Sequence, residues 1–368
     1  MPELDTISIH GFRSIARAVD LKLGAITVLI GPNGAGKSNF LEVFAFLHAL
    51  REGHLQTYVG EAGGANRLLH FGAKTTKELR IKLSFRDEVN GYQIDLRPTD
   101  TDELLPGPEF VSYWHRQKYG DPGEFQLPPR GKEAGISDPL SSGAASHVRS
   151  DLGSWRTYHF HDTGRGAALK LAANIDDNRY LRPDGSNLPA FLYLLREAQP
   201  ASYALIRETV RLVAPFFDDF TLEPQSLNPD MIRLEWRHRN TEAYFDVSSL
   251  SDGTLRFIAL ATLFLQPRHL RPSVILVDEP ELGLHPYAIT ILASLVKQAS
   301  IETQVILATQ SPLLLDHFAP EDVLIADLID GSTRFSRLDP DKLANWLQDY
   351  SLGQLWEKNE IGGRPGGA

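Results

Sequence analysis

The chain has 368 residues, of which 42% are hydrophobic and 23% charged, and it contains no cysteine. This length and composition predict one large folded domain or a domain with an added lobe, and exclude disulfides, thiolate metal sites and cysteine nucleophiles. The net charge of -10 has the wrong sign for a protein that coats nucleic acid, so any DNA contact needs a local basic patch. The sequence shows no leader pattern and no run of about 18 apolar residues, which predicts a cytoplasmic protein without a membrane segment.

Residues 1–100 are predicted to form an antiparallel β part that also carries a strand, turn and helix unit. The expected elements are strands at 4–12 and 25–30, a helix at 38–50, and strands at 78–85 and 91–96. The second strand is an apolar run that stops at a glycine, and helical spacing of apolar residues begins soon afterwards. The last two strands alternate apolar and polar positions around an Asn-Gly pair, which is typical of a β-hairpin.

Residues 101–247 are predicted to be an inserted lobe. Residues 119–147 are rich in Pro, Gly and Ser, which predicts a long flexible loop. Periodicity predicts further elements, namely helices at 166–173, 188–197 and 202–214 and strands at 220–222, 231–237 and 243–247.

Residues 248–368 alternate helix and strand patterns, which predicts a parallel sheet with covering helices. The expected elements are helices at 252–265, 287–299 and 312–317 and strands at 273–277 and 304–308. Neither a repeat nor a sustained heptad pattern occurs, so a long coiled coil is not expected. The glycine-rich end, residues 361–368, is predicted to fray.

The segment GPNGAGKS, residues 31–38, matches the P-loop pattern at every fixed position. Its glycines let successive backbone N–H groups turn towards a β-phosphate, in front of the positive end of the next helix. Lys37 is expected to neutralise the β- and γ-phosphates of ATP, and the Ser38 hydroxyl to bind Mg²⁺. The competing interpretation, a glycine turn with a solvated lysine, does not explain the strand before it and the helix after it. The predicted nucleotide contacts are Gly31, Asn33, Gly34, Ala35, Gly36, Lys37, Ser38 and Asn39.

A second segment, VILVDEPELGLHP at residues 274–286, is a buried strand pattern that ends in two adjacent carboxylates. Asp278 is expected to hold Mg²⁺ through its water shell, and Glu279 to polarise the attacking water. A hydrophilic strand end is the ordinary explanation of a lone Asp-Glu pair. Its place after a P-loop and behind an apolar strand instead favours phosphoryl transfer.

A third segment, SSLSDGTLRFIAL at residues 248–260, resembles the signature of ATP-binding-cassette (ABC) ATPases. Ser251 is an N-cap residue and Gly253 lies in the first helical turn, so this helix start presents N–H groups and a hydroxyl to an anion. The resemblance implies an α/β P-loop NTPase with an ABC-type head: a mixed core sheet, an antiparallel β subdomain and a helical signature lobe. In the ABC family the signature contacts the γ-phosphate on the opposite subunit. One P-loop and one signature per chain therefore imply an ATP-dependent, head-to-tail homodimer.

Two segments after Glu279 extend this resemblance. ELGLHP, residues 281–286, is similar to the loop that crosses the ABC dimer interface, and LATQSP, residues 307–312, is similar to the switch segment. The family usually has a histidine at the γ-phosphate in that segment, and this chain has Gln310. An amide donates a hydrogen bond but cannot take up or release a proton near neutral pH, so ATP binding with slow hydrolysis is expected.

The opening strand resembles that of the RecF/SMC-like branch of these ATPases. SIHGFRSI, residues 8–15, is similar to the first strand of those ATPases, which implies that Arg13 approaches the nucleotide; a surface charge is an equally good interpretation. Three other segments resemble bacterial relatives of the same kind, YHFHD (158–162), DGSNL (184–188) and the ending YSLGQLWEKNEIGGRP (350–365). The family's glutamine loop has no clear counterpart, because Gln93 lies in a hairpin strand.

These motifs favour an ATP-gated dimeric switch in DNA maintenance or defence. The alternative is a regulatory ATPase that controls a separate effector protein, a nuclease or a toxin. The cassette of a membrane transporter is disfavoured by the long, hairpin-rich spacing between P-loop and signature. A DNA-binding surface would need basic residues, and the candidates, each more simply a solvated face, are Arg233, Arg237, Arg239, Arg268 and Arg271. The pair His159 and His161 is read as surface histidines, so no dedicated protein metal site is expected.

Overall fold

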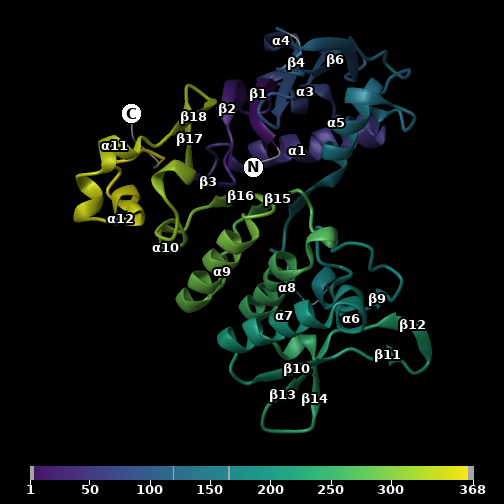
Figure 1. Ribbon diagram of the computed structural model, residues 1–368, viewed down its shortest axis with the longest axis vertical. Helices are drawn as coiled ribbons and strands as arrows, with labels where there is room; N and C mark the ends of the chain where they lie inside the picture. Colours follow the sequence, from purple (N-terminus) through teal and green to yellow (C-terminus); the bar gives the residue numbers. More distant parts are fainter. Residues whose placement is uncertain (1–3, 119, 165, 364–368) are drawn as a thin grey trace.

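The computed structural model describes residues 4–118, 120–164 and 166–363. A central sheet lies between an antiparallel β part and a helical lobe (Figure 1). The strands of the central sheet follow the order β18-β17-β3-β16-β15-β8, and all neighbours pair in parallel except β18 with β17. The bounds are β3 Ile26–Ile30, β8 Trp155–Tyr158, β15 Val274–Asp278, β16 Gln304–Thr309, β17 Val323–Ile329 and β18 Ser332–Arg337. Parallel pairing brings the carboxyl ends of five strands to one edge of the sheet.

Strands β3 and β16 are buried at every position. Strands covered on both faces have continuous apolar sequences. The apolar runs at residues 25–30 and 304–308 therefore predicted these two strands. Strand β8 is short and mixed in polarity. Nothing local indicates that it joins this sheet beside β15.

The antiparallel sheet has the strand order β2-β1-β4-β5-β6-β7. Its strands are β1 Leu4–Phe12, β2 Ile15–Lys22, β4 Leu79–Phe85, β5 Asn90–Pro98, β6 Leu104–Tyr113 and β7 Gly123–Gln126. The predicted hairpin is present, with Phe85 opposite Asn90. Helix α1, Lys37–Glu52, lies between this sheet and the central one, and its apolar face contributes to a core shared by both sheets. Three short helices connect it to β4, namely α2 Leu55–Glu61, α3 Ala65–Leu68 and α4 Gly72–Thr75.

The segment predicted as one long loop, residues 119–147, contains β7, the 3₁₀ turn η1 at Gly135–Ser137 and the start of helix α5, Gly143–Ser154. The cause is a buried carboxylate on β6. Glu109 accepts hydrogen bonds from the N–H groups of Gly135 (2.6 Å) and Ile136 (2.9 Å) and from the Tyr92 hydroxyl (3.0 Å). Burial raises the pKa of Glu109, and these donors oppose that rise. A distant acceptor therefore fixes backbone that local composition marks as a loop.

The helical lobe does not include all of residues 101–247, because β6 and β7 pair in the antiparallel sheet and β8 pairs in the central sheet. It contains helices α6 Leu188–Ala198, α7 Pro200–Val213 and α8 Asp252–Leu265 (Figure 1). Small sheets accompany them, built from β9 Ala173–Asn174, β10 Phe217–Thr221, β11 Pro224–Gln225, β12 Asn228–Ile232, β13 Glu235–His238 and β14 Tyr244–Asp246. The helix predicted at 166–173 is wrong. Only the 3₁₀ turn η2, Ala168–Lys170, forms there before the chain enters β9.

The last part of the chain adds α9 Pro286–Ala299, α10 Pro312–Leu315, α11 Pro340–Leu343 and α12 Leu352–Glu357. The end predicted to fray is ordered as far as Gly363: Ile361 is buried, and the Gly363 N–H donates to Asp327 Oδ1 at 2.9 Å. The remainder of that prediction, residues 364–368, lies outside the described residues. None of the described helices is long and apolar enough to cross a membrane.

Candidate nucleotide site

The P-loop follows β3 and ends where α1 begins at Lys37. Gly34 and Gly36 have φ values of 78° and 99°, which side chains adopt only with strain. Gly36 also has no room for a side chain, since a Cβ atom there would lie 2.7 Å from Ser14 Oγ. The loop therefore needs glycine at this position for its shape and for close packing. Asn33 and Gly34 are exposed, whereas Ala35 is buried.

Lys37 folds back over the P-loop and is only 6% exposed. Its Nζ donates to the carbonyl oxygens of Gly31 (2.7 Å) and Pro32 (3.0 Å). Burial lowers the pKa of Lys37, and the carboxylates of Glu279 and Asp278 oppose this change. A buried ammonium held by neutral carbonyls is well suited to exchange them for phosphate oxygens.

Ser38 and Asp278 meet across the site. The Ser38 hydroxyl donates to Asp278 Oδ2 at 3.0 Å, which joins the first turn of α1 to the end of β15. A hydroxyl and a carboxylate are hard oxygen donors, and Mg²⁺ is commonly bound by one or two such groups together with phosphates and water. No group of three or more His, Asp or Glu side chains within the described residues is placed to hold a metal. These two residues therefore fit a Mg²⁺ ion that arrives with a nucleotide.

Glu279 and Gln310 are brought into direct contact. Glu279 has a φ of 42°, and its N–H donates to the Ala308 carbonyl at 2.8 Å. The Gln310 side-chain amide donates to Glu279 Oε1. The residue predicted to polarise water and the residue predicted to contact the γ-phosphate thus lie together at the ends of adjacent strands β15 and β16.

Glu281 is a part of the site that the sequence analysis did not identify. Its Oε1 accepts from the Thr309 hydroxyl at 2.5 Å and from the Gln310 N–H at 3.3 Å, while Oε2 is buried without a partner in the described structure. Burial raises the pKa of this carboxyl group. Glu281 therefore fixes the backbone from which Gln310 projects.

His161 and His159 reach the site from β8, the strand beside β15. His161 Nε2 is hydrogen-bonded to the Asp278 backbone oxygen at 2.8 Å, whereas His159 is exposed, as the sequence predicted. His161 contacts a backbone carbonyl here, which differs from the surface position expected from the sequence. The position of His161 depends on the pairing of β8 with β15, and no local sequence pattern indicates that pairing.

The signature helix α8 is capped by Ser251, whose side chain accepts from the Thr254 N–H at 3.2 Å, as predicted for an N-cap. Gly253 lies directly against Gly283, where a side chain would overlap the Gly283 carbonyl oxygen. One turn later the buried Arg256 donates to the carbonyls of Phe160 (2.8 Å), His161 (2.9 Å) and Leu282. The helix start is therefore rigidly connected to the segments that follow β8 and β15.

Arg13 and Asn39 lie beside the P-loop in different ways. The Arg13 guanidinium pairs with Glu42 on α1, which also accepts from the Tyr58 hydroxyl at 2.9 Å. The Asn39 amide donates to Ser14 Oγ at 2.7 Å, so its side chain supports the turn between β1 and β2. A nucleotide role for Arg13 remains a prediction, since its charge is already paired with Glu42.

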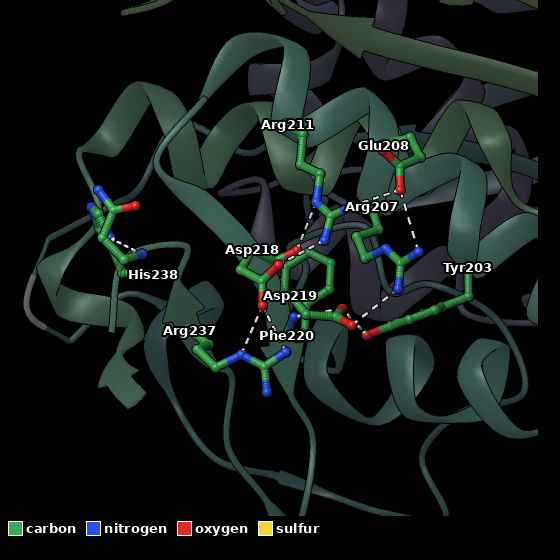
Figure 2. A network of polar contacts seen from close by, with 10 residues as sticks. Tyr203, Arg207, Glu208, Arg211, Asp218, Asp219, Phe220, Arg237 and His238 are labelled. Atoms are coloured by element: carbon green, nitrogen blue, oxygen red, sulfur yellow. Dashed lines mark hydrogen bonds and ion pairs between the residues drawn. The ribbon is translucent and has the colours of Figure 1, made fainter. Parts of the chain in front are cut away.

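Arg237, one of the basic residues considered for DNA binding, is paired with an acidic side chain. Figure 2 shows Arg237 and Arg211 on either side of Asp218, with ion-pair distances of 2.6 and 2.8 Å. Asp219 binds Arg207 at 3.1 Å and the Tyr203 hydroxyl at 2.7 Å in the same network. Charges paired in this way attract phosphates weakly, so a DNA surface on this part of the lobe remains a prediction.

The P-loop, the Asp-Glu strand end and the signature helix on this mixed sheet define an ABC-type P-loop fold. The chain belongs to the family described as "AAA domain, putative AbiEii toxin, Type IV TA system", whose model matches residues 26–316.

Known proteins are similar to this chain in part of the sequence and in overall fold. A RecF DNA replication and repair protein from Paenarthrobacter aurescens is 46% identical over 55 residues, which is 15% of this chain and 14% of RecF. An SMC head bound to the C-winged helix domain of ScpA has a TM-score of 0.60 at 17% identity, covering 94% of this chain and all of the head. An SMC head with an extended coiled coil, bound to the C-terminal domain of ScpA from Pyrococcus furiosus, also gives 0.60 at 16% identity, with 95% and 99% coverage. At these identities the SMC comparisons show the fold.

Proposed function

We propose that this chain is an ATP-gated switch in which two copies close head to tail around MgATP and slow hydrolysis reopens them. The observation that carries the proposal is that the nucleotide motifs of one chain fall into two separate groups. Lys37, Ser38, Asp278 and Glu279 gather at one edge of the central sheet. Within the described structure, no hydrogen bond or ion pair joins residues 251–254 to the P-loop, and the Ser251 hydroxyl contacts only Thr254. An exposed helix start of this kind is suited to a phosphate held by a second copy.

Each of these residues has a separate role within such a site. Backbone N–H groups of the P-loop and Lys37 hold the phosphates, and Ser38 with Asp278 hold Mg²⁺, which would neutralise phosphate charge when bound. Glu279 orients water, and its contact with the Gln310 amide keeps its carboxylate in place. Gln310 has no titratable proton, so it supports phosphate recognition more than proton transfer. Slow turnover suits a switch whose closed state must persist.

Glu279→Gln is the variant that tests this function. Replacing the carboxylate by an amide removes the general base, with an expected loss of turnover of about 10² to 10⁴-fold, and leaves ATP binding intact. Size-exclusion chromatography with light scattering should then show a dimer with MgATP and a monomer without it. Glu302→Gln, an exposed change away from the site, serves as the control. A Glu279→Gln protein that stays monomeric with saturating MgATP would contradict the proposal.

DNA is the partner that the RecF similarity favours, and a separate effector is the alternative, favoured by the toxin-related description of the family. ATPase activity with and without duplex DNA, at two stated salt concentrations, separates these roles. Stimulation that falls as salt rises would support DNA, because phosphate contacts release counterions. An unchanged rate at low salt would favour the effector.

A further inference from the structure

Residues 352–363, close to the C-terminus, run from helix α12 to the P-loop. We call this segment the hook. It starts with helix α12, which Ser351 and Gln354 cap reciprocally. The Gly353 N–H donates to Asp316 Oδ1 at 2.6 Å, and a side chain at position 353 would come within 2.5 Å of the Pro312 carbonyl oxygen. The hook is therefore anchored on α10, the helix that directly follows Gln310.

The far end of the hook is held by two hydrogen bonds. The Trp356 indole N–H donates to the Gly363 carbonyl at 3.0 Å, and the Gly363 N–H donates to Asp327 Oδ1 at 2.9 Å. Gly362 and Gly363 have φ values of 82° and 76°, which close the turn at little cost only because both residues are glycine. Trp356 is 7% exposed, so its indole and the turn form a buried, satisfied unit.

The turn reaches the first residue of the P-loop. A Cβ atom at position 363 would lie 3.1 Å from Trp356 Nε1, 3.2 Å from Ile325 Cγ2 and 3.6 Å from Gly31 Cα, the last being an ordinary van der Waals contact. A side chain at Gly31 would overlap the Ala326 carbonyl oxygen, so Gly31 is bounded by β17 and by the hook. The Gly31 carbonyl in turn accepts from Lys37 Nζ at 2.7 Å. The hook thus supports the residue that holds the phosphate-binding lysine.

We infer that the hook is a positioning element for the P-loop, with Trp356 and Gly363 setting the place of Gly31 and hence of Lys37. This inference rests on the proposed ATP function and assigns a role to a segment that carries none of the nucleotide motifs. It differs from a purely structural role, because it predicts that a small change at the turn alters nucleotide affinity at unchanged stability.

The matched pair Gly363→Ala and Gly362→Ala provides the test. Both glycines have positive φ, so both substitutions introduce similar backbone strain. Among the described residues, a Cβ atom at 362 would approach only Asp327 and Ile325, at 3.5 and 3.9 Å, whereas one at 363 would approach Trp356 and Ile325 and would also contact Gly31. ATP dissociation constants are measured by calorimetry with a non-hydrolysable ATP analogue and Mg²⁺, together with unfolding temperatures. Gly363→Ala should weaken binding by about fivefold or more relative to Gly362→Ala, at equal unfolding temperature.

Trp356→Phe is a second variant that keeps a buried aromatic ring, although a smaller one, and removes the hydrogen bond to Gly363. It should weaken binding of the analogue in the same direction by about two- to fivefold, the effect of one hydrogen bond. Equal affinities for the wild type, Gly363→Ala and Trp356→Phe would overturn the inference while leaving the ATP function standing. A wild-type chain that binds no analogue would overturn both.

Discussion

The Ser38 hydroxyl lies 3.0 Å from Asp278 Oδ2, although 240 positions separate the two residues along the chain. The contact exists because β3 and β15 are parallel strands with only β16 between them, so their carboxyl ends meet at one edge of the sheet. The same edge holds Lys37, Glu279 and Gln310. Sheet topology therefore assembles the candidate site.

Lys37→Ala should weaken ATP binding by about 100-fold or more, because it removes a buried ammonium whose phosphate contacts are charge-assisted. Calorimetric titration with MgATP measures the change. Lys77→Ala, which removes an exposed lysine elsewhere, should leave the affinity within about twofold of wild type. Retained micromolar affinity in Lys37→Ala would show that this loop does not hold the phosphates.

Gln310→His should change turnover more than affinity. A histidine has a proton available near neutral pH, whereas the amide has none, so steady-state hydrolysis is expected to rise by about tenfold or more. The dissociation constant for a non-hydrolysable analogue should stay within about threefold, since either side chain donates one hydrogen bond. The same hydrolysis rate in both proteins would mean that Gln310 does not face the γ-phosphate.

Glu281 should make stability depend on pH. Burial raises its pKa above the ordinary 4.5, so the folded state binds a proton more tightly than the unfolded state does. Its favourable contribution is therefore full below about pH 4.5 and is lost as the pH rises through the folded-state pKa. Glu281→Gln keeps an acceptor for Thr309 and should raise the unfolding temperature at pH 7 by about 1 to 3 °C.

The control for that prediction is Glu61→Gln, at an exposed position on α2. It should shift the unfolding temperature by less than about 1 °C at either pH. The gain from Glu281→Gln should shrink when the pH is lowered towards 4.5. A gain of the same size at both pH values, or a loss at pH 7, would rule out a destabilising buried carboxylate.

Much of the site could be predicted because its motifs are local. The P-loop needs glycines and a lysine at fixed spacing between a buried strand and a helix, and all of these are visible in residues 25–50. Ser251 is likewise recognisable as an N-cap from the residues around it. The hairpin of β4 and β5 could be predicted from its alternating apolar and polar residues and its Asn-Gly pair.

The parts that could not be predicted depend on contacts between distant segments. His161 meets Asp278 only because β8 pairs with β15, and the sequence does not indicate that pairing. The segment after β6 has the composition of a loop, yet Glu109 on β6 orders it through its backbone N–H groups. Gly363 looks like part of a frayed tail until Trp356 and Asp327 supply its hydrogen-bond partners.

The central claim, that each ATP site combines the P-loop of one copy with the signature of another, is tested by mixing two inactive variants. Lys37→Ala lacks a working P-loop, and Ser251→Arg places a bulky charge where the partner's phosphate would lie. A dimer that contains one of each retains one intact composite site, so the equimolar mixture should show about a quarter of wild-type ATPase activity, while each variant alone shows almost none. A mixture as inactive as its components would contradict the account.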